Sequence, residues 1–254
     1  MVQLLELPPD LPDTKNKEAG ASKFCPGCGH GIILKTLAKV VSEMGLKERA
    51  VFGCDIGCSL LSWDYMNLDT VQTHHGRTTP VIYGVTRANP GTVGIAYMGD
   101  GGGLAIGSQH LVNATVRSEN MLIMLANNTN YGMTGGQMAP TTMPGQVTET
   151  TPYGRDCETT GKPAKGAEMV AAIANPEKSY VARASVGNIR KLKSTIQKAL
   201  ENVSNGGFSF VEVLSLCPLN WRTNNVDTWG RLEKMEQCFE VKEFMTPTIE
   251  VKEN

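Results

Sequence analysis

Short, wholly apolar runs alternate with amphipathic stretches along most of the chain. Two of these runs, residues 92–98 and residues 121–126, are joined by a segment with helical spacing. Runs that are apolar at nearly every position are typical of strands buried on both faces, and a helical link between two of them indicates a parallel β-α-β unit. The pattern therefore predicts an α/β fold in which a mostly parallel sheet carries helices on both faces.

The rest of the chain continues this pattern. Apolar residues recur at helical spacing from Ile33 to Met44, and Gly45 marks the end of that helix. Residues 140–165 show no periodicity, and an ordered loop of that length is more often functional than idle. Further helices are expected at 167–174 and around 189–200, and further strands at 50–53, 180–182 and 208–214.

The sequence predicts that the chain is divided into an arm, one domain and a tail. Residues 1–22 contain several prolines and predict an N-terminal arm. Residues 23–221 carry the strand and helix pattern and predict one domain. Residues 222–254 are polar with scattered apolar positions, and we expect this C-terminal tail to pack on a partner subunit.

The composition narrows the class of protein. With 254 residues, 41% of them hydrophobic, the chain can bury one full core. Its net charge of -1 disfavours nucleic acid and anionic membranes as partners. No apolar run is long enough to cross a membrane, and the amino terminus lacks the basic and apolar regions of a signal peptide, so the sequence predicts a cytoplasmic location. Seven cysteines, an odd number, favour reduced or metal-bound thiols over a disulfide framework.

Oxygen-bearing side chains follow the two central apolar runs. The sequence Gly99-Asp100-Gly101-Gly102 ends the first, and Asn127-Asn128 ends the second. Carboxyl ends of parallel strands meet at one edge of a sheet, where open α/β sheets bind ligands. Oxygen ligands suit Mg²⁺, and a glycine run lets backbone amides approach an anion. The pattern predicts a site for Mg²⁺ and a diphosphate, although two buried strands ending in ordinary loops is the simpler alternative.

The segment after Asn128 adds to this prediction. It reads Thr-Asn-Tyr-Gly-Met-Thr-Gly-Gly-Gln over residues 129–137. Adjacent glycines and hydroxyl residues suit a loop that wraps a diphosphate. Gly132 and Thr134 are the candidate diphosphate contacts in this loop.

Four cysteines occupy positions that suit a metal cluster. Cys25 and Cys28 form a Cys-x-x-Cys turn before a helix, whereas Cys58 and Cys217 follow expected strands. Because no thioredoxin-like strand precedes the turn, a metal is favoured over a redox pair. Four thiolates at one end of a sheet could hold a [4Fe-4S] cluster. Cys54 could replace Cys58, and the alternative for each cysteine is a small buried side chain.

The turn at residues 73–80 lies before the Asp100 strand and should face the same edge of the sheet. His75 could shuttle a proton or donate to an anion, and Arg77 could pair with a carboxylate or phosphate. These two residues are the catalytic candidates. A packed histidine beside a surface arginine is the alternative, and we assign His30 and His110 structural roles.

Several segments together resemble a known family. Gly-Asp-Gly, 25 residues (102–126) and then Asn-Asn resembles the diphosphate-binding motif of thiamine diphosphate enzymes. From about Phe24 to Trp221 the chain resembles the β subunit of the 2-oxoacid:ferredoxin oxidoreductases, of the ketoisovalerate and 2-oxoglutarate type. The other supporting segments are Cys-Pro-Gly-Cys-Gly (25–29), His-Gly-Arg (75–77), Tyr-Gly-Met-Thr-Gly-Gly-Gln (131–137) and Cys-Pro-Leu-Asn-Trp (217–221).

The resemblance implies a fold, cofactors and a reaction. It implies the diphosphate-binding domain of the thiamine diphosphate fold, with Mg²⁺ held by Asp100, the Asn128 side chain and the main-chain carbonyl of Asn130. The implied reaction is CoA-dependent oxidative decarboxylation of a 2-oxo acid to acyl-CoA and CO₂. Electrons would pass through the [4Fe-4S] cluster to ferredoxin. Some family members carry a substrate-binding lysine where Gly135 stands. Because this chain has glycine there, the resemblance does not identify the side chain of its 2-oxo acid.

The resemblance also implies partners. One glutamate of such enzymes belongs to a pyrimidine-binding domain that this chain lacks, so an α subunit should supply it and the chain alone should be inactive. A γ subunit and a ferredoxin-like δ subunit complete the implied hetero-oligomer. Two rival functions are a zinc-binding structural module built on cysteines and the diphosphate half of a non-oxidative decarboxylase. A brown colour bleached by dithionite would argue against both.

Overall fold

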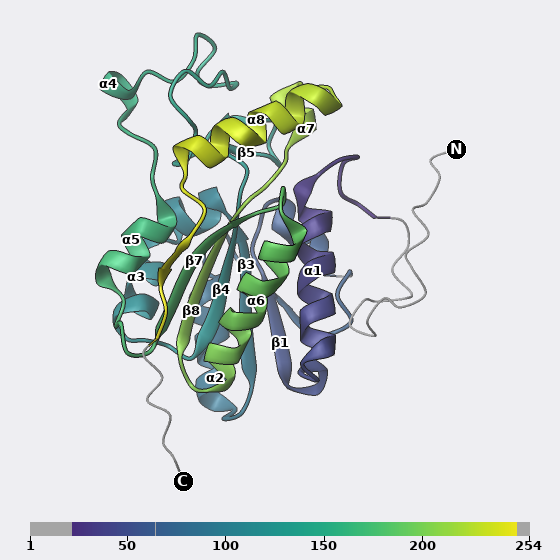
Figure 1. Cartoon of the computed structure of the whole chain (residues 1–254), viewed down its shortest axis with the longest axis vertical. Helices are drawn as coiled ribbons and strands as arrows, with labels where there is room; N and C mark the ends of the chain where they lie inside the picture. The colour runs from purple at the N-terminus through teal and green to yellow at the C-terminus, as the bar shows by residue number, and fades with distance from the viewer. Residues whose placement is uncertain (1–21, 64, 248–254) are drawn as a thin grey trace.

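A computed structural model describes residues 22–63 and 65–247, and a seven-stranded sheet forms its centre (Figure 1). The strand order is β2-β1-β3-β4-β8-β7-β9, and the first six strands pair in parallel, whereas β9 is antiparallel to β7. The predicted α/β fold is confirmed. The strands are β1 (Ala50–Cys54), β2 (Asp69–Gln72), β3 (Val93–Gly99), β4 (Met121–Asn127), β7 (Ser179–Ser185), β8 (Phe208–Leu214) and β9 (Glu243–Met245).

Helices cover both faces of the sheet because the central strands are apolar on both sides. Every residue of β4, β7 and β8 is buried. On one face, side chains from α1 (Gly29–Glu43), α6 (Ile189–Ser204) and α8 (Asn225–Cys238) form one core cluster with the strands. On the other face, α2 (Thr78–Ala88), α3 (Ser108–Val116) and α5 (Gly166–Ile173) form a second cluster. The sheet thus lies between two helical layers, as predicted.

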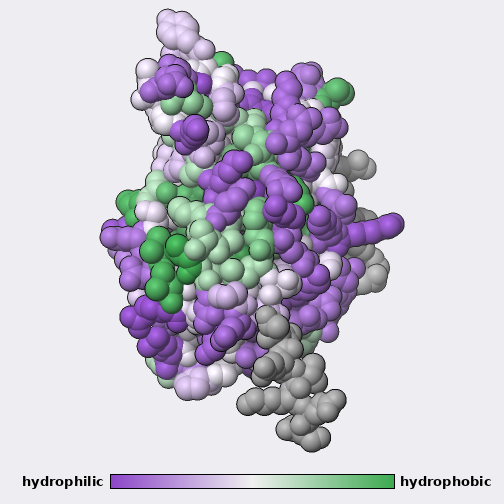
Figure 2. All heavy atoms as spheres, turned by 60° about the vertical axis from the view of Figure 1, so that its left-hand side comes forward, coloured by the Kyte–Doolittle hydropathy of each residue, from purple (hydrophilic) through white to green (hydrophobic). Residues whose placement is uncertain are grey.

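The outer sides of the two layers differ. Val112 and Val116 of α3 and Ile173 of α5 are exposed, and Figure 2 shows hydrophobic side chains gathered on the side of the molecule where α3 and α5 lie. On the opposite layer, exposed positions of α6 carry lysines, such as Lys193 and Lys198, paired with glutamates. No helix in the described part of the chain is both long and apolar enough to span a bilayer.

The connection from β3 to α3 departs from a regular helix. Residues Gly102–Ile106 form a π-helical turn, η3, in which the Gly107 amide donates to the Gly102 carbonyl at 2.9 Å. A Cβ at Gly103 would lie 2.6 Å from Leu125 Cδ1, and one at Gly102 would overlap the Asp55 carboxylate. The glycine run therefore lets this turn pack against the neighbouring strand ends.

The end of the chain packs on this chain itself, through α8 and β9. That residues 222–254 also pack on a partner subunit stays a prediction, and Val226 and Trp229 of α8 are exposed. Leu232, Met235 and Phe239 are buried in the core, and β9 extends the sheet beside β7. Their spacing of three and four residues places one apolar stripe of α8 against the domain. The predicted N-terminal arm, up to residue 21, and the last residues, 248–254, lie outside the described residues.

Short elements occupy the edge of the sheet where the parallel strands end. They are the 3₁₀ turn η2 (Cys58–Ser62), the hairpin β5 (Asn130–Tyr131) and β6 (Gln137–Met138), α4 (Cys157–Thr160) and α7 (Pro218–Trp221). The expected loop from Pro140 to Lys165 is largely irregular, with α4 inside it. In Figure 1 this loop, α7 and α8 lie above the carboxyl ends of the strands.

Candidate active site

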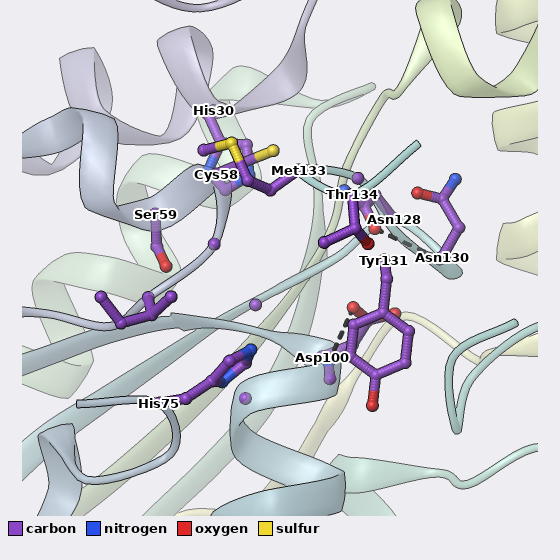
Figure 3. A pocket seen from close by; sticks show the side chains of 16 residues that line it. His30, Cys58, Ser59, His75, Asp100, Asn128, Asn130, Tyr131, Met133 and Thr134 are labelled. Carbon is purple, nitrogen blue, oxygen red and sulfur yellow. Dashed lines mark hydrogen bonds between the residues drawn. The ribbon is translucent and has the colours of Figure 1, made fainter. Parts of the chain in front are cut away.

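A cavity of about 120 Å³ opens at this edge of the sheet. Residues that follow β1, β3 and β4 line it, together with the loop after Asn128 (Figure 3). Of the sequence-predicted residues, those in its wall are Cys58, His75, Gly99, Asp100, Gly101, Gly102, Asn128, Asn130, Gly132 and Thr134. The fold thus brings together ten candidates that span 77 residues of sequence.

Asp100 is a buried carboxylate at the end of β3. Its Oδ1 accepts from the Gly101 amide at 2.9 Å, and its Oδ2 accepts from the Thr141 hydroxyl. Burial raises the pKa of Asp100 to about 7, against the lowering effect of these hydrogen bonds. A buried carboxylate without a cationic partner is costly. A divalent cation at this place would remove that cost, which fits a metal ligand.

The two asparagines after β4 have different surroundings. The Asn127 side chain donates to Glu212 Oε1 at 2.7 Å and accepts from the Thr129 amide at 3.1 Å. The Asn128 side chain instead lies in the cavity wall, and its main-chain carbonyl accepts from Trp221 Nε1 at 3.0 Å. Asn127 therefore holds the turn in place. The Asn128 amide oxygen accepts from the Asn130 amide at 3.3 Å and has a second lone pair for a group in the cavity.

Two side-chain oxygens in the turn after Asn128 are unpaired. Asn130 Oδ1 and Thr129 Oγ1 are buried without a hydrogen-bond partner. Thr129 has a φ of 61°, a left-handed conformation that strains a β-branched residue. Buried polar groups are normally hydrogen-bonded, so unpaired acceptors in the turn whose Thr129 amide donates to Asp100 fit a cation site. The unpaired oxygen of Asn130 is on its side chain, whereas the resemblance implied its carbonyl.

Glycines bring the cavity wall close together. The ring of Tyr131 fills the space that a side chain at Gly101 would need, and a Cβ at Gly132 would lie 3.1 Å from Cys58 Sγ. The Gly132 carbonyl accepts from the Asn220 side chain at 2.7 Å. Thr134 bonds through its hydroxyl to Gln137 and lies in the cavity wall. The geometry suits a small anionic group bound against backbone.

The four candidate cluster cysteines come together beside this cavity. Burial, with a smaller contribution from the nearby Cys217, Cys58 and Cys25, raises the pKa of Cys28 to about 12. Burial raises the pKa of Cys58 to about 12 in the same way, with Cys217 and Cys25 adding to it. Thiols this costly to ionise favour a bound cationic group that stabilises the thiolates.

The structure favours Cys58 over Cys54 in this group. Cys54 lies inside β1, is fully buried and donates through Sγ to the Val71 carbonyl at 3.7 Å. Burial raises its pKa to about 11, and the only acid acting on it is Asp55. Cys54 therefore does not share the surroundings of the other four.

Amide donors surround two of the clustered sulfurs. The Asn220 side chain lies 3.5 Å from Cys217 Sγ, and the Asn130 side chain also donates to it. The His30 amide donates to Cys28. Such hydrogen bonds stabilise metal-bound thiolates and tune the potential of an iron-sulfur cluster. In residues 22–63 and 65–247, no three Cys, His, Asp or Glu side chains converge on one point as ligands of a single ion would.

The structure separates the two catalytic candidates. His75 lines the cavity, but Arg77 does not: its guanidinium donates to the His75 carbonyl at 2.8 Å. His30 also reaches the cavity wall, where its Nδ1 bonds to the Tyr97 hydroxyl and its ring stacks on Phe24. Burial lowers the pKa of His30 to about 4, so it is neutral at pH 7.

Three residues that contribute to the site were not among the candidates. Asp55 follows β1 as Asp100 follows β3, so its position at a strand end was a usable signal. Thr141 lies in an irregular loop, and Glu212 lies within β8. Their hydrogen bonds to Asp100 and Asn127 join segments 41 and 85 residues apart, and no local pattern indicates such pairs.

Comparisons with known proteins agree with this geometry. The family described as thiamine pyrophosphate enzyme, C-terminal TPP binding domain, matches residues 55–213. Ketoisovalerate oxidoreductase subunit VorA of Methanothermobacter thermautotrophicus is 38% identical over 98% of this chain and 54% of the relative. The 2-oxoglutarate synthase subunit KorB of the same species is 35% identical over 87% of this chain and 72% of the relative.

A solved structure extends the likeness. The chain matches 2-oxoglutarate:ferredoxin oxidoreductase from Magnetococcus marinus, whose structure has 2-oxoglutarate, coenzyme A and succinyl-CoA bound. The TM-score is 0.75 at 28% identity, over 90% of this chain and 74% of that chain. The chain spans about half the length of the VorA relatives that it matches.

Proposed function

Because the chain belongs to the 2-oxoacid:ferredoxin oxidoreductases, as their thiamine pyrophosphate-binding subunit, we propose that it is the cofactor-binding part of a CoA-dependent 2-oxo acid oxidoreductase. The complete enzyme would convert a 2-oxo acid and CoA to acyl-CoA and CO₂ and pass the electrons to ferredoxin. This chain would hold thiamine diphosphate, Mg²⁺ and a [4Fe-4S] cluster.

One observation carries the proposal: the oxygen site and the thiol site share a wall. A Cβ at Gly132 would lie 3.1 Å from Cys58 Sγ and 3.5 Å from the Asn128 side-chain amide. Cys58, Asp100 and Asn128 all line the same cavity. A non-oxidative decarboxylase has no use for clustered thiols at this place, whereas a one-electron acceptor needs them close to the reacting group.

Each proposed cofactor has its own residues. Asp100, Asn128 and Asn130 would hold Mg²⁺, and Gly99, Gly101, Gly102, Gly132 and Thr134 would contact the diphosphate. Thiamine diphosphate supplies, when bound, the nucleophilic carbon and the electron sink that decarboxylation requires. Cys25, Cys28, Cys58 and Cys217 would hold the cluster that takes up single electrons.

His75 and Arg77 would have different tasks. His75 lies in the cavity wall, where its imidazole could exchange a proton with a bound group. Arg77 is only partly exposed and points its guanidinium back to the turn. We propose that Arg77 stabilises the turn that carries His75 unless a partner subunit or ligand draws it toward the site.

The cavity favours an apolar 2-oxo acid. Ile56 and Met133 line it and are partly exposed, at 38% and 47%. No lysine or arginine occurs among the lining residues in the described part of the chain. A second carboxylate, as in 2-oxoglutarate, requires a cation to bind it. We therefore propose a branched-chain substrate such as 2-oxoisovalerate, with 2-oxoglutarate as the second candidate if a partner supplies that cation.

The proposal is tested with the complete complex. The complex is purified without oxygen, and CoA-dependent ferredoxin reduction is measured with 2-oxoisovalerate, 2-oxoglutarate, pyruvate and phenylglyoxylate in parallel. We expect the highest kcat/KM with 2-oxoisovalerate and no reduction when CoA is left out. Release of CO₂ without ferredoxin reduction would replace the proposal by the non-oxidative decarboxylase. A preference for 2-oxoglutarate would overturn the substrate assignment alone.

A further inference from the structure

The buried carboxylate of Asp55 lies beside His75, and it has no role in the function proposed above. Asp55 follows β1, and His75 lies in the turn between β2 and α2. Asp55 Oδ2 lies 3.6 Å from His75 Nδ1. The Asp55 side chain is fully buried, whereas the His75 side chain is 39% exposed. One side of the imidazole thus faces a buried acid and the other side faces the cavity (Figure 3).

The surroundings fix the position of the carboxylate. Asp55 Oδ1 accepts from the Gly76 amide at 2.7 Å and from the Thr78 hydroxyl at 3.2 Å. The Ile56 amide also donates to it. Burial raises the pKa of Asp55, whereas these three donors and the nearby His75 oppose that rise and favour the ionised form. Asp55 is therefore an acceptor that other groups already hold in a fixed orientation.

The second oxygen of Asp55 has one polar neighbour. Asp55 Oδ2 and His75 Nδ1 are both buried, and neither has a hydrogen-bond partner. Their separation of 3.6 Å is slightly longer than a hydrogen bond, so a small rotation of the imidazole would pair them. A Cβ at Gly102 would overlap Asp55 Oδ2, so the glycine leaves room for the carboxylate beside the turn that carries Asp100. The oxygen thus lies between the diphosphate-side turn and the imidazole, with His75 Nδ1 within 3.6 Å of it.

We propose that Asp55 is a positioning residue that holds His75 in one tautomer. An ionised Asp55 accepts from Nδ1–H, and the neutral imidazole then presents the lone pair of Nε2 to the cavity. His75 is thereby set as a proton acceptor from a group bound in the cavity. The identity of that group rests on the proposed function, but the tautomer does not.

The tautomer of His75 can be determined by NMR without an activity assay. The full chain contains four histidines, so ¹⁵N labelling of histidine gives few signals in a proton-nitrogen correlation spectrum at pH 8. His75→Gln identifies the signals of His75, and His74→Gln is the matched control at the exposed neighbour. We expect wild-type His75 to carry its proton on Nδ1. A proton on Nε2 would overturn the proposal without the need for any variant at Asp55.

The substitution Asp55→Asn tests whether Asp55 sets the tautomer of His75. It keeps an oxygen for the Gly76 and Thr78 donors and replaces Oδ2 by an amide that donates to Nδ1. We expect the proton of His75 to move to Nε2. An unchanged tautomer in a folded Asp55→Asn chain, checked by circular dichroism, would mean that Asp55 does not set it.

The same variant is then assayed in the complete complex. We expect kcat to fall by about a hundredfold, as for a lost proton acceptor. KM and thiamine diphosphate content should stay as in the wild type, which separates positioning from binding. An unchanged kcat beside a switched tautomer would remove His75 from the proton transfer. If the wild-type complex reduces no ferredoxin, the proposed function fails, whereas the tautomer result stands by itself.

Discussion

At the scale of single residues, Asp100 should decide whether Mg²⁺ and thiamine diphosphate bind. The substitution Asp100→Asn keeps the size of the side chain and removes the charge that a divalent cation requires. We expect the holoenzyme variant to lose Mg²⁺ and thiamine diphosphate and to keep its iron, since Asp100 is not one of the four residues proposed to hold the cluster. Elemental analysis and cofactor extraction measure all three.

Asp69→Asn is the matched control for this substitution. Asp69 is an exposed aspartate of β2, away from the cavity wall. Its variant should keep both cofactors and the iron. Full thiamine diphosphate in the Asp100 variant would show that the cation is held elsewhere.

A second residue-scale prediction concerns the third cluster ligand. Cys58 shares its surroundings with Cys25 and Cys217, whereas Cys54 donates to a strand carbonyl within the sheet. Cys58→Ser should therefore lose most of the iron and the absorbance that dithionite bleaches, and Cys54→Ser should keep both. Iron analysis of the two variants, purified without oxygen, makes the comparison. The opposite pattern would move the ligand to Cys54.

At the scale of elements, a buried ion pair joins the site to the tail. Arg183 of β7 lies 2.9 Å from Glu212 of β8, and both side chains are fully buried. Glu212 also accepts from the Ala167 amide of α5 and from Asn127. Arg183 in turn donates to the Glu240 carbonyl at 2.9 Å. The pair thus ties α5, the turn after β4 and the segment after α8 together.

Breaking this pair should be costly. Removing Glu212 would leave Arg183, within the described residues, paired only with the partly exposed Glu168 and would remove the acceptor of the Asn127 and Ala167 donors. A lost hydrogen bond to a charged group costs about 1.5–3 kcal/mol. Glu212→Gln should lower the free energy of unfolding by about that amount. Urea denaturation followed by fluorescence measures it, with the exposed Glu201→Gln as the control. Equal midpoints for both variants would contradict the assigned role of the pair.

The tail elements give a second prediction at this scale. Phe239 is fully buried, and the guanidinium of Arg183 lies 5.5 Å from the centre of its ring. Phe239→Ala should lower the free energy of unfolding by about 3–5 kcal/mol through the cavity that it leaves. Val226→Ala, at an exposed position of α8, the helix that Phe239 follows, should change it little. Similar losses for both would mean that α8 does not belong to the core.

Sequence patterns predicted the elements that are built from apolar runs. They gave little information on elements and contacts that depend on polar residues distant in sequence. Strands β3, β4 and β8 are apolar nearly throughout, so periodicity and length identify them. Helix α8 has few apolar positions, and the strand residue that its end packs on is an arginine, so its attachment to this domain gave little signal. Asp100 and Asn128 were found because strand ends converge, whereas Thr141 and Glu212 act through contacts distant in sequence.

At the scale of the whole molecule, the site is open on one side. Leu219 and Val226 are exposed near the edge of the sheet that carries the cavity, and Tyr153 in the long loop is fully exposed. Exposed apolar side chains around a concave site are typical of a surface that another protein covers. The cavity wall in the described residues also contains a single carboxylate, Asp100.

This single carboxylate leads to the last prediction. Thiamine diphosphate enzymes of this kind need a glutamate that faces the aminopyrimidine, and we propose that an α subunit supplies it. The purified chain alone, given Mg²⁺ and thiamine diphosphate, should then release no CO₂ from 2-oxoisovalerate. Addition of the α subunit should restore release, and an α subunit with that glutamate replaced by glutamine should not. Activity of the isolated chain would show that its own residues complete the site, and the complex formed with the Asp100→Asn chain serves as the inactive control.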